Sequence, residues 1–203
     1  MSILSMRRRA VEKTKGLPDG YLQLDYIGIY TRKFSTGFLP NKFSKVEIVY
    51  KGTQLSSAKA GALFGCRAAY KTNGFYYRTY ASNASDTTTR FELGWGNEII
   101  RTDSLNINSS DLHVYGVNGG VFYVDDIVLH TFNTTTTPGY ELYINAINDG
   151  GSLLNVNGTN GNLYSFKIWD NGEMVRNYIP VKRLNDNVKG LFDLINNQFI
   201  VST

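Results

Sequence analysis

Acidic residues in two segments of this 203-residue chain come closest to the spacing of a catalytic pair. Glu92 and Glu98 lie in RFELGWGNEII, six positions apart, with two glycines between them. A retaining glycoside hydrolase needs an acid and a nucleophile about 5 Å apart, which a regular strand provides from alternate positions. Asp125 and Asp126 are adjacent, so a strand would point them to opposite faces. Neither pair fits this chemistry, and we predict that the chain is not an enzyme.

Metal ligands are equally sparse. The chain has two histidines, His113 and His130, and one cysteine, Cys66, which lies in the apolar run GALFGCRAAY and is expected to be a buried, inert thiol. Asp149 in INDGGS and Asp186 in LNDNVKG have asparagine neighbours that suit either a calcium loop or a tight turn. We favour the turn, and we expect no metal and no cofactor.

Aromatic and amide side chains offer a different chemistry, that of sugar binding. Sugars stack their apolar faces on aromatic rings, while amides take their hydroxyl groups. Trp95 stands between two glycines and is followed by Asn97 in LGWGN, and Tyr76 and Tyr77 are adjacent in NGFYYRTYASN. Because adjacent strand residues point to opposite faces, one of the two tyrosines is expected to face outward. The candidate carbohydrate-binding residues are Trp95, Tyr77 and Asn97.

Positive charge is concentrated at the N-terminus. The formal net charge is +4, and the first sixteen residues carry +4 by themselves, since they contain five basic residues and one acidic residue. Such an arm can bind an acidic protein surface or stay solvated. We expect Arg7, Arg8 and Arg9 to anchor the chain to a partner. Lysines and arginines elsewhere are scattered, so nucleic acid binding by the body is not expected.

The remaining chain has the pattern of consecutive antiparallel strands. The turn cluster Gly16-Leu17-Pro18-Asp19-Gly20 divides an arm at residues 1–16 from one domain at residues 17–203. In SKVEIVY, apolar Val46, Ile48 and Tyr50 share one strand face. No helical stripe and no run of about 18 apolar residues for a membrane span is present. An all-β, two-sheet antiparallel jelly-roll sandwich preceded by a short basic arm is therefore expected.

Glycine-containing turns mark two hairpins within this pattern. Asn118-Gly119-Gly120 is expected to connect a strand ending at Val117 to a strand running from Val121 to Leu129. Asp170-Asn171-Gly172 is expected to connect the strands of YSFKIWDNGEMVRNYIPVKR, residues 164–183. We expect this second hairpin to close the sandwich, with its aromatic residues serving in packing; these are Tyr164, Phe166 and Trp169.

The segments LPDGYLQLDYI, ALFGCR, HVYGVNGGVFYVDD and GNLYSFKIWDNGEMVRNYIPVKRLNDNVKGLFDLINNQFI resemble the concanavalin A-like, laminin-G-like jelly rolls of tailed bacteriophages and gut bacteria. The resemblance covers residues 17 to about 200 and implies the fold. Since such folds serve lectins, hydrolases and virion modules alike, it bears less on function. It implies a non-enzymatic phage virion structural protein, on the capsid or the tail, whose body binds host-surface glycans.

The partners expected for such a protein are other virion proteins, reached through the arm, and copies of itself in a homo-oligomer, without a membrane. The alternative is a bacterial carbohydrate-binding or adhesin module. A secreted module would need a signal peptide, and the N-terminal sequence MSILSMRRRAVEKTKG does not resemble one, so localisation in the virion is favoured.

Overall fold

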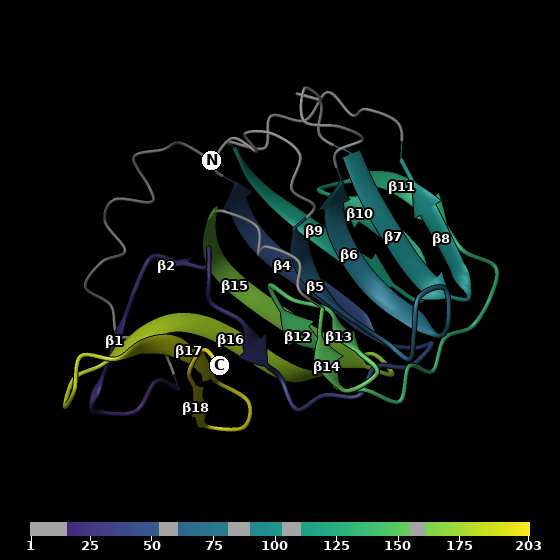
Figure 1. Cartoon of the computed structure of the whole chain (residues 1–203). Helices are drawn as coiled ribbons and strands as arrows, with labels where there is room; N and C mark the ends of the chain where they lie inside the picture. Colours follow the sequence, from purple (N-terminus) through teal and green to yellow (C-terminus); the bar gives the residue numbers. More distant parts are fainter. Residues whose placement is uncertain (1–15, 53–60, 81–89, 103–110, 155–160) are drawn as a thin grey trace.

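The computed structural model describes residues 16–52, 61–80, 90–102, 111–154 and 161–203, and these residues form two packed β-sheets without a helix (Figure 1). The expected all-β, two-sheet sandwich of jelly-roll type is confirmed. All strand pairs but one are antiparallel; the exception is the short pair of β13 with β5. No helix in the described ranges is long and apolar enough to cross a membrane.

The larger sheet has ten strands. Its main path runs in the order β11 (Ile127–Thr131), β10 (Val121–Val124), β9 (Leu112–Asn118), β4 (Lys45–Gly52), β15 (Gly161–Asp170), β16 (Glu173–Arg183), β17 (Lys189–Asp193) and β18 (Gln198–Ile200). Two short strands pair beside this path, β1 (Tyr21–Gln23) with β16 and β2 (Ile27–Gly28) with β15.

The smaller sheet has eight strands. Its main path runs in the order β14 (Ser152–Leu153), β13 (Asn148–Asp149), β5 (Ala62–Arg67), β6 (Gly74–Tyr80), β7 (Arg90–Gly96) and β8 (Glu98–Arg101). β12 (Tyr143–Ile144) pairs with both β5 and β3 (Phe34–Ser35). β3 thus carries the segment after residue 35 to the flank of the sandwich.

The core lies between the two sheets and is rich in aromatic rings. On β4, Val46, Ile48 and Tyr50 are buried, as the alternation in the sequence predicted. Phe64 of the smaller sheet meets Phe166 of the larger sheet edge-on at 5.8 Å between ring centroids. Each such large buried side chain stabilises the fold by roughly 1.5 to 3 kcal/mol. Hydrophobic burial between the sheets therefore holds the sandwich together.

Both predicted glycine turns are present, and both use backbone conformations that suit their residues. Gly119 and Gly120 have φ of +54° and +89°, and Asn171 and Gly172 have φ of +49° and +83°. These values match two-residue hairpin turns, whose twist agrees with that of the strands. The strand predicted from Val121 to Leu129 is wrong, because a further turn at Asp125 and Asp126 divides it into β10 and β11.

The hairpin of β15 and β16 lies at the centre of the larger sheet and not at a closing edge. Phe166 is fully buried in the core, as predicted. Tyr164 and Trp169 are only partly buried and pack on the outer surface, Tyr164 against Tyr26 at 5.7 Å between ring centroids and Trp169 beneath the Lys45 ammonium group at 4.4 Å. The hairpin thus contributes one face to the core and leaves the other partly open to solvent.

Candidate functional site

A groove of about 480 Å³ opens at the flank of the sandwich, where the smaller sheet's β3 approaches the end of the larger sheet. This volume is in the range of small-molecule sites. The residues that line it come from three distant parts of the chain: Ser35, Thr36, Gly37, Arg176, Gln198, Ile200, Val201 and Thr203. The lining therefore combines residues that carry hydroxyl, amide and guanidinium groups with the apolar residues Ile200 and Val201.

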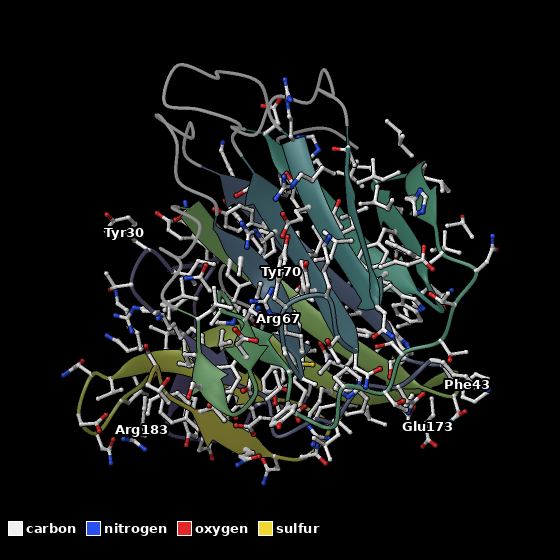
Figure 2. All side chains as sticks on the ribbon, turned by 45° about the vertical axis from the view of Figure 1, so that its right-hand side comes forward. Tyr30, Phe43, Arg67, Tyr70, Glu173 and Arg183 are labelled. Atoms are coloured by element: carbon white, nitrogen blue, oxygen red, sulfur yellow. The ribbon has the colours of Figure 1, made fainter. Side chains whose placement is uncertain are left out.

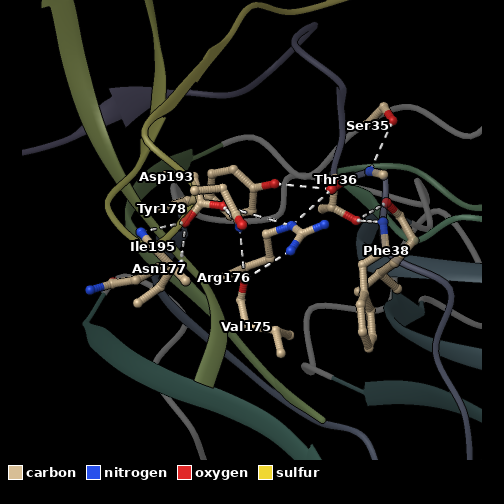
Figure 3. Close-up of polar contacts among 12 residues, drawn as sticks. Ser35, Thr36, Phe38, Val175, Arg176, Asn177, Tyr178, Asp193 and Ile195 are labelled. Carbon is tan, nitrogen blue, oxygen red and sulfur yellow. Dashed lines mark hydrogen bonds and ion pairs between the residues drawn. The ribbon is translucent and has the colours of Figure 1, made fainter. Parts of the chain in front are cut away.

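Arg176 occupies an unusual position in this groove. It pairs across the sheet with Ile168, which is fully buried in the core, so its side chain belongs to the inward face of β16. The guanidinium Nε donates to the Thr36 carbonyl oxygen at 3.3 Å and Nη1 donates to the Val175 carbonyl oxygen at 2.8 Å (Figure 3). These bonds fix the plane of the guanidinium group while 23% of the side chain stays exposed.

The carboxylate of Asp193 lies behind Arg176 and is completely buried. It accepts hydrogen bonds from the backbone N–H groups of Asn177 at 2.9 Å and Ile195 at 3.0 Å, and from Nδ2 of Asn196 at 2.6 Å. The nearest approach of Arg176 Nε to Asp193 Oδ2 is 3.7 Å. Three donors therefore satisfy Asp193, and its contact with the arginine is a longer ion pair.

Thr36 supports the groove from the opposite side. Its carbonyl oxygen accepts from Arg176 and also from the Tyr178 hydroxyl at 3.1 Å (Figure 3). Its own hydroxyl donates to the Leu142 carbonyl oxygen at 2.7 Å and accepts from the Phe38 N–H. Burial raises the pKa of Tyr178 to about 12, an effect that Asp193 adds to and Arg176 opposes. The polar groups of this wall are therefore held in place before any ligand arrives.

The last wall is the segment that follows β18. Its position is fixed by Lys33, whose N–H donates to the Ser202 hydroxyl at 3.1 Å and whose carbonyl oxygen accepts from the Thr203 N–H at 3.0 Å. Val201 is 46% exposed and contributes apolar surface to the groove. This wall is thus joined to the loop before β3 by hydrogen bonds.

The predicted carbohydrate-binding aromatics are not at this groove and not on the surface. Trp95 is 1% exposed, packs against Phe75, and donates from Nε1 to the Thr134 carbonyl oxygen at 2.8 Å. Tyr77 is 0% exposed and donates to the Tyr123 carbonyl oxygen. Because both rings point into the core, no sugar can stack on them, and the prediction that they bind sugar is wrong.

The other predicted site residues lie elsewhere. Asn97 is exposed at the turn between β7 and β8, where its Oδ1 accepts from the Asn73 N–H at 3.0 Å. It does not line the groove. The predicted anchor residues Arg7, Arg8 and Arg9 lie outside the described residues. The sequence analysis did not predict Arg176. The usable signal was strand alternation, which places Arg176 on the same face as Tyr178, two positions later.

Tyr76, which alternation places on the outer face, is nevertheless only 1% exposed. A Cβ on Gly94 would overlap its ring, so the ring lies over the glycine of the neighbouring strand. Its hydroxyl donates to Oε1 of Glu92 at 3.3 Å, and Oε2 of Glu92 accepts from Arg101 Nε at 2.9 Å. Glu92 is 1% exposed and also contacts Arg78 at 3.4 Å. This carboxylate is thus held in an ion-pair network.

The carboxylates of Asp149 and Asp186 each form an ion pair with an arginine. Asp149 accepts two bonds from Arg67, at 2.8 and 3.0 Å, beside the Tyr70 ring on the outer face of the smaller sheet (Figure 2). Asp186 accepts from Arg183 at 3.2 and 2.7 Å. Among the described residues, no group of three or more histidine, cysteine or acidic side chains could hold a metal ion.

Comparison with known proteins finds similar chains among solved structures. No protein-family model matches the chain, and no curated protein matches it. The CBM40 domain of the Ruminococcus gnavus IT-sialidase, solved bound to alpha2,3 sialyllactose, is 12% identical with a TM-score of 0.46, over 73% of this chain and 91% of that one. A native heptameric SAP-like pentraxin from Limulus polyphemus is 14% identical with a TM-score of 0.48, over 89% and 90%.

Proposed function

We propose that this chain is a non-catalytic, carbohydrate-binding β-sandwich domain and that the flank groove is its binding site. The observation that carries the proposal is the lining of the groove, which combines the polar residues Ser35, Arg176 and Gln198 with the apolar residues Ile200 and Val201. A sugar presents hydroxyl groups at its edge and apolar C–H groups on its faces, and it needs both kinds of partner. A small open groove with this lining suits one or two sugar rings.

The acidic residues support binding in preference to hydrolysis. The described lining of the groove contains no Asp or Glu. Glu92 and Asp149 both belong to the smaller sheet, but β7 and β13 are separated by β6 and β5. Each of these carboxylates is also bound by an arginine, Glu92 by Arg101 at 2.9 Å and Asp149 by Arg67 at 2.8 Å. A glycosidase needs two carboxylates that flank the bound sugar, and neither Glu92 nor Asp149 lines the groove.

A glycan array tests this function. We expect the wild-type chain to retain a subset of glycans, and Gln198→Ala to weaken that binding at least fivefold, because the amide lines the groove. Asn97→Ala is the matched control, since it removes an exposed amide outside the groove and should leave binding unchanged. An array on which nothing binds, or on which only the Asn97 variant loses binding, would contradict the proposal.

Placement in a phage virion, with anchoring through the basic arm, is the second part of the proposal. It rests on the sequence resemblance and on the charge of residues 1–16. Replacing Arg7, Arg8 and Arg9 with serine should preserve the melting temperature but reduce incorporation into particles, and the difference from the wild type should shrink at higher salt, which screens the arginine charges. Normal incorporation of this variant would favour the alternative, a bacterial carbohydrate-binding or adhesin module.

A further inference from the structure

We propose that Arg176 makes the flank groove selective for acidic glycans, those whose sugar rings carry a carboxylate; this rests on the proposed glycan-binding function. The inference begins with the position of the side chain. Arg176 follows the inward register of β16, between the core contacts of Ile168 and Tyr178. A charged group at the margin of a core is costly unless it is paired or hydrogen-bonded, and Arg176 meets this condition through Thr36, Val175 and Asp193.

The guanidinium group is oriented but not saturated by the protein. An arginine carries five N–H donors in a planar fork. Two of them donate to the carbonyl oxygens of Thr36 and Val175, and these two bonds fix the plane. The donors that remain can form the parallel pair of charge-assisted bonds by which arginine binds a carboxylate. Because the side chain is already held, a ligand would not have to order it on binding.

The buried carboxylate of Asp193 does not prevent Arg176 from binding the carboxylate of a ligand. Asp193 Oδ2 is 3.7 Å from Nε, and the carboxylate is already satisfied by three nitrogen donors. It is completely buried and does not line the groove. A second carboxylate could therefore bind Arg176 from the groove without leaving Asp193 unpaired.

A second acidic residue, Glu141, contacts the groove residue Ser35. Its Oε2 accepts from the Ser35 hydroxyl at 2.8 Å. Burial raises the pKa of Tyr143, and the hydrogen bond of Tyr143 with Glu141 and the charge of Glu141 raise it further. Since Glu141 is held by its own donors, it does not occupy the lining. Within the described lining, the one ionised side chain is Arg176, so a carboxylate ligand can form a charge-assisted pair there.

The rest of the lining indicates how an acidic sugar would lie. With its carboxylate on Arg176, the ring would cover the apolar surface of Ile200 and Val201. The hydroxyl groups of the ring would then face Gln198 and Ser35. A neutral sugar could make the same apolar and hydroxyl contacts but would lose the charge-assisted pair.

The test compares acidic glycans with neutral partners of the same structure. Oligosaccharides of glucuronate, galacturonate and mannuronate are each titrated beside their carboxyl-reduced forms by isothermal calorimetry, with the full chain. We expect at least tenfold tighter binding of the acidic member of a pair, and a stronger loss of affinity with salt than for the neutral member. Arg176→Gln should abolish the preference, and Arg176→Lys should reduce it, because lysine keeps the charge but lacks the fork.

Arg183→Gln is the matched control, since this arginine lies on the same strand but pairs with Asp186 outside the groove. It should keep the full preference. Equal binding of acidic and neutral members by the wild-type chain overturns the selectivity and leaves the glycan-binding function standing. If neither member of any pair binds and the array is also empty, both proposals are wrong. If Arg176→Gln does not fold, the Arg176→Lys variant and the salt dependence decide.

Discussion

The two tryptophans show how differently one residue type can be used at the scale of the single side chain. Trp95 is enclosed by the core, where it meets Phe75 and Phe122 at 5.4 and 6.2 Å between ring centroids. Trp169 lies on the outer surface of the larger sheet and is capped by Lys45 at 4.4 Å. Removing the first ring leaves a cavity, whereas removing the second opens surface to solvent.

Trp95→Ala is therefore expected to lower the free energy of unfolding by about 3 to 5 kcal/mol, the usual cost of deleting a buried aromatic ring. Trp169→Ala should cost about 1 kcal/mol, because a partly exposed cation–π contact contributes little. Urea denaturation of both variants measures the difference. Equal losses in the two variants would show that Trp95 is not the core residue described above.

At the scale of the strand, glycines make room for tyrosines on the neighbouring strand. Gly65 and Gly94 pair directly with Tyr76 from either side, and a Cβ on either glycine would overlap its side chain. Gly116 has the same relation to Tyr123, whose hydroxyl donates to Glu47 at 2.8 Å. Each aromatic ring thereby covers the backbone that the glycine would leave exposed.

Gly94→Ala should destabilise the protein by about 1 to 3 kcal/mol, because the added methyl group must displace the Tyr76 ring. In a Tyr76→Ala background the same substitution should cost much less, so the two changes should be coupled. Gly28→Ala is the control, since the atom nearest to a Cβ added there, apart from the adjacent residues, would be Asn162 Oδ1 at 3.9 Å. A double-mutant cycle by urea denaturation measures the coupling, and strictly additive losses would contradict the stacking.

The turns that contain Asp149 and Asp186 lead to a prediction about metal. Each carboxylate already accepts two bonds from an arginine, Arg67 and Arg183 respectively. Adding a chelator should therefore leave the melting temperature unchanged, because no bound ion stabilises these turns. A fall of several degrees that calcium reverses would show that the loops hold a metal after all.

At the scale of the whole molecule, the many buried tyrosines make stability depend on alkaline pH. Burial raises the pKa of Tyr178 to about 12, and it also raises the pKa values of Tyr76, Tyr77, Tyr115 and Tyr123. An unfolded tyrosine titrates near pH 10. A group whose pKa is higher in the folded state stabilises that state fully below about pH 10. This contribution is lost as the pH rises through the folded pKa.

Urea denaturation at pH 9, 10.5 and 11.5 should therefore show a steady loss of stability above pH 10. Tyr178 alone should account for about 2 to 3 kcal/mol of it by pH 12. Tyr178→Phe should flatten the curve by that share, while the Thr36 carbonyl oxygen keeps its bond from Arg176. Stability that stays constant up to pH 11.5 would contradict the burial of these hydroxyl groups.

The sequence alone determined the local features of this protein. The alternation of Val46, Ile48 and Tyr50 and the Asn171-Gly172 turn could be predicted because each depends on residues close together in the chain. A series of such strands and turns without helical periodicity was enough to predict the all-β sandwich. Local signals failed where a turn lacked glycine, as at Asp125 and Asp126.

Tertiary structure decided which residues are available to a ligand. Alternation separates the two faces of a strand, but it does not say which face is covered: Trp95 and Tyr77 face the core, and even the outward Tyr76 is buried over Gly94. The groove joins Thr36 to Arg176 across 140 positions of the chain. Such a site depends on how the two sheets pack against each other, and contacts at that sequence distance leave no local pattern in the sequence.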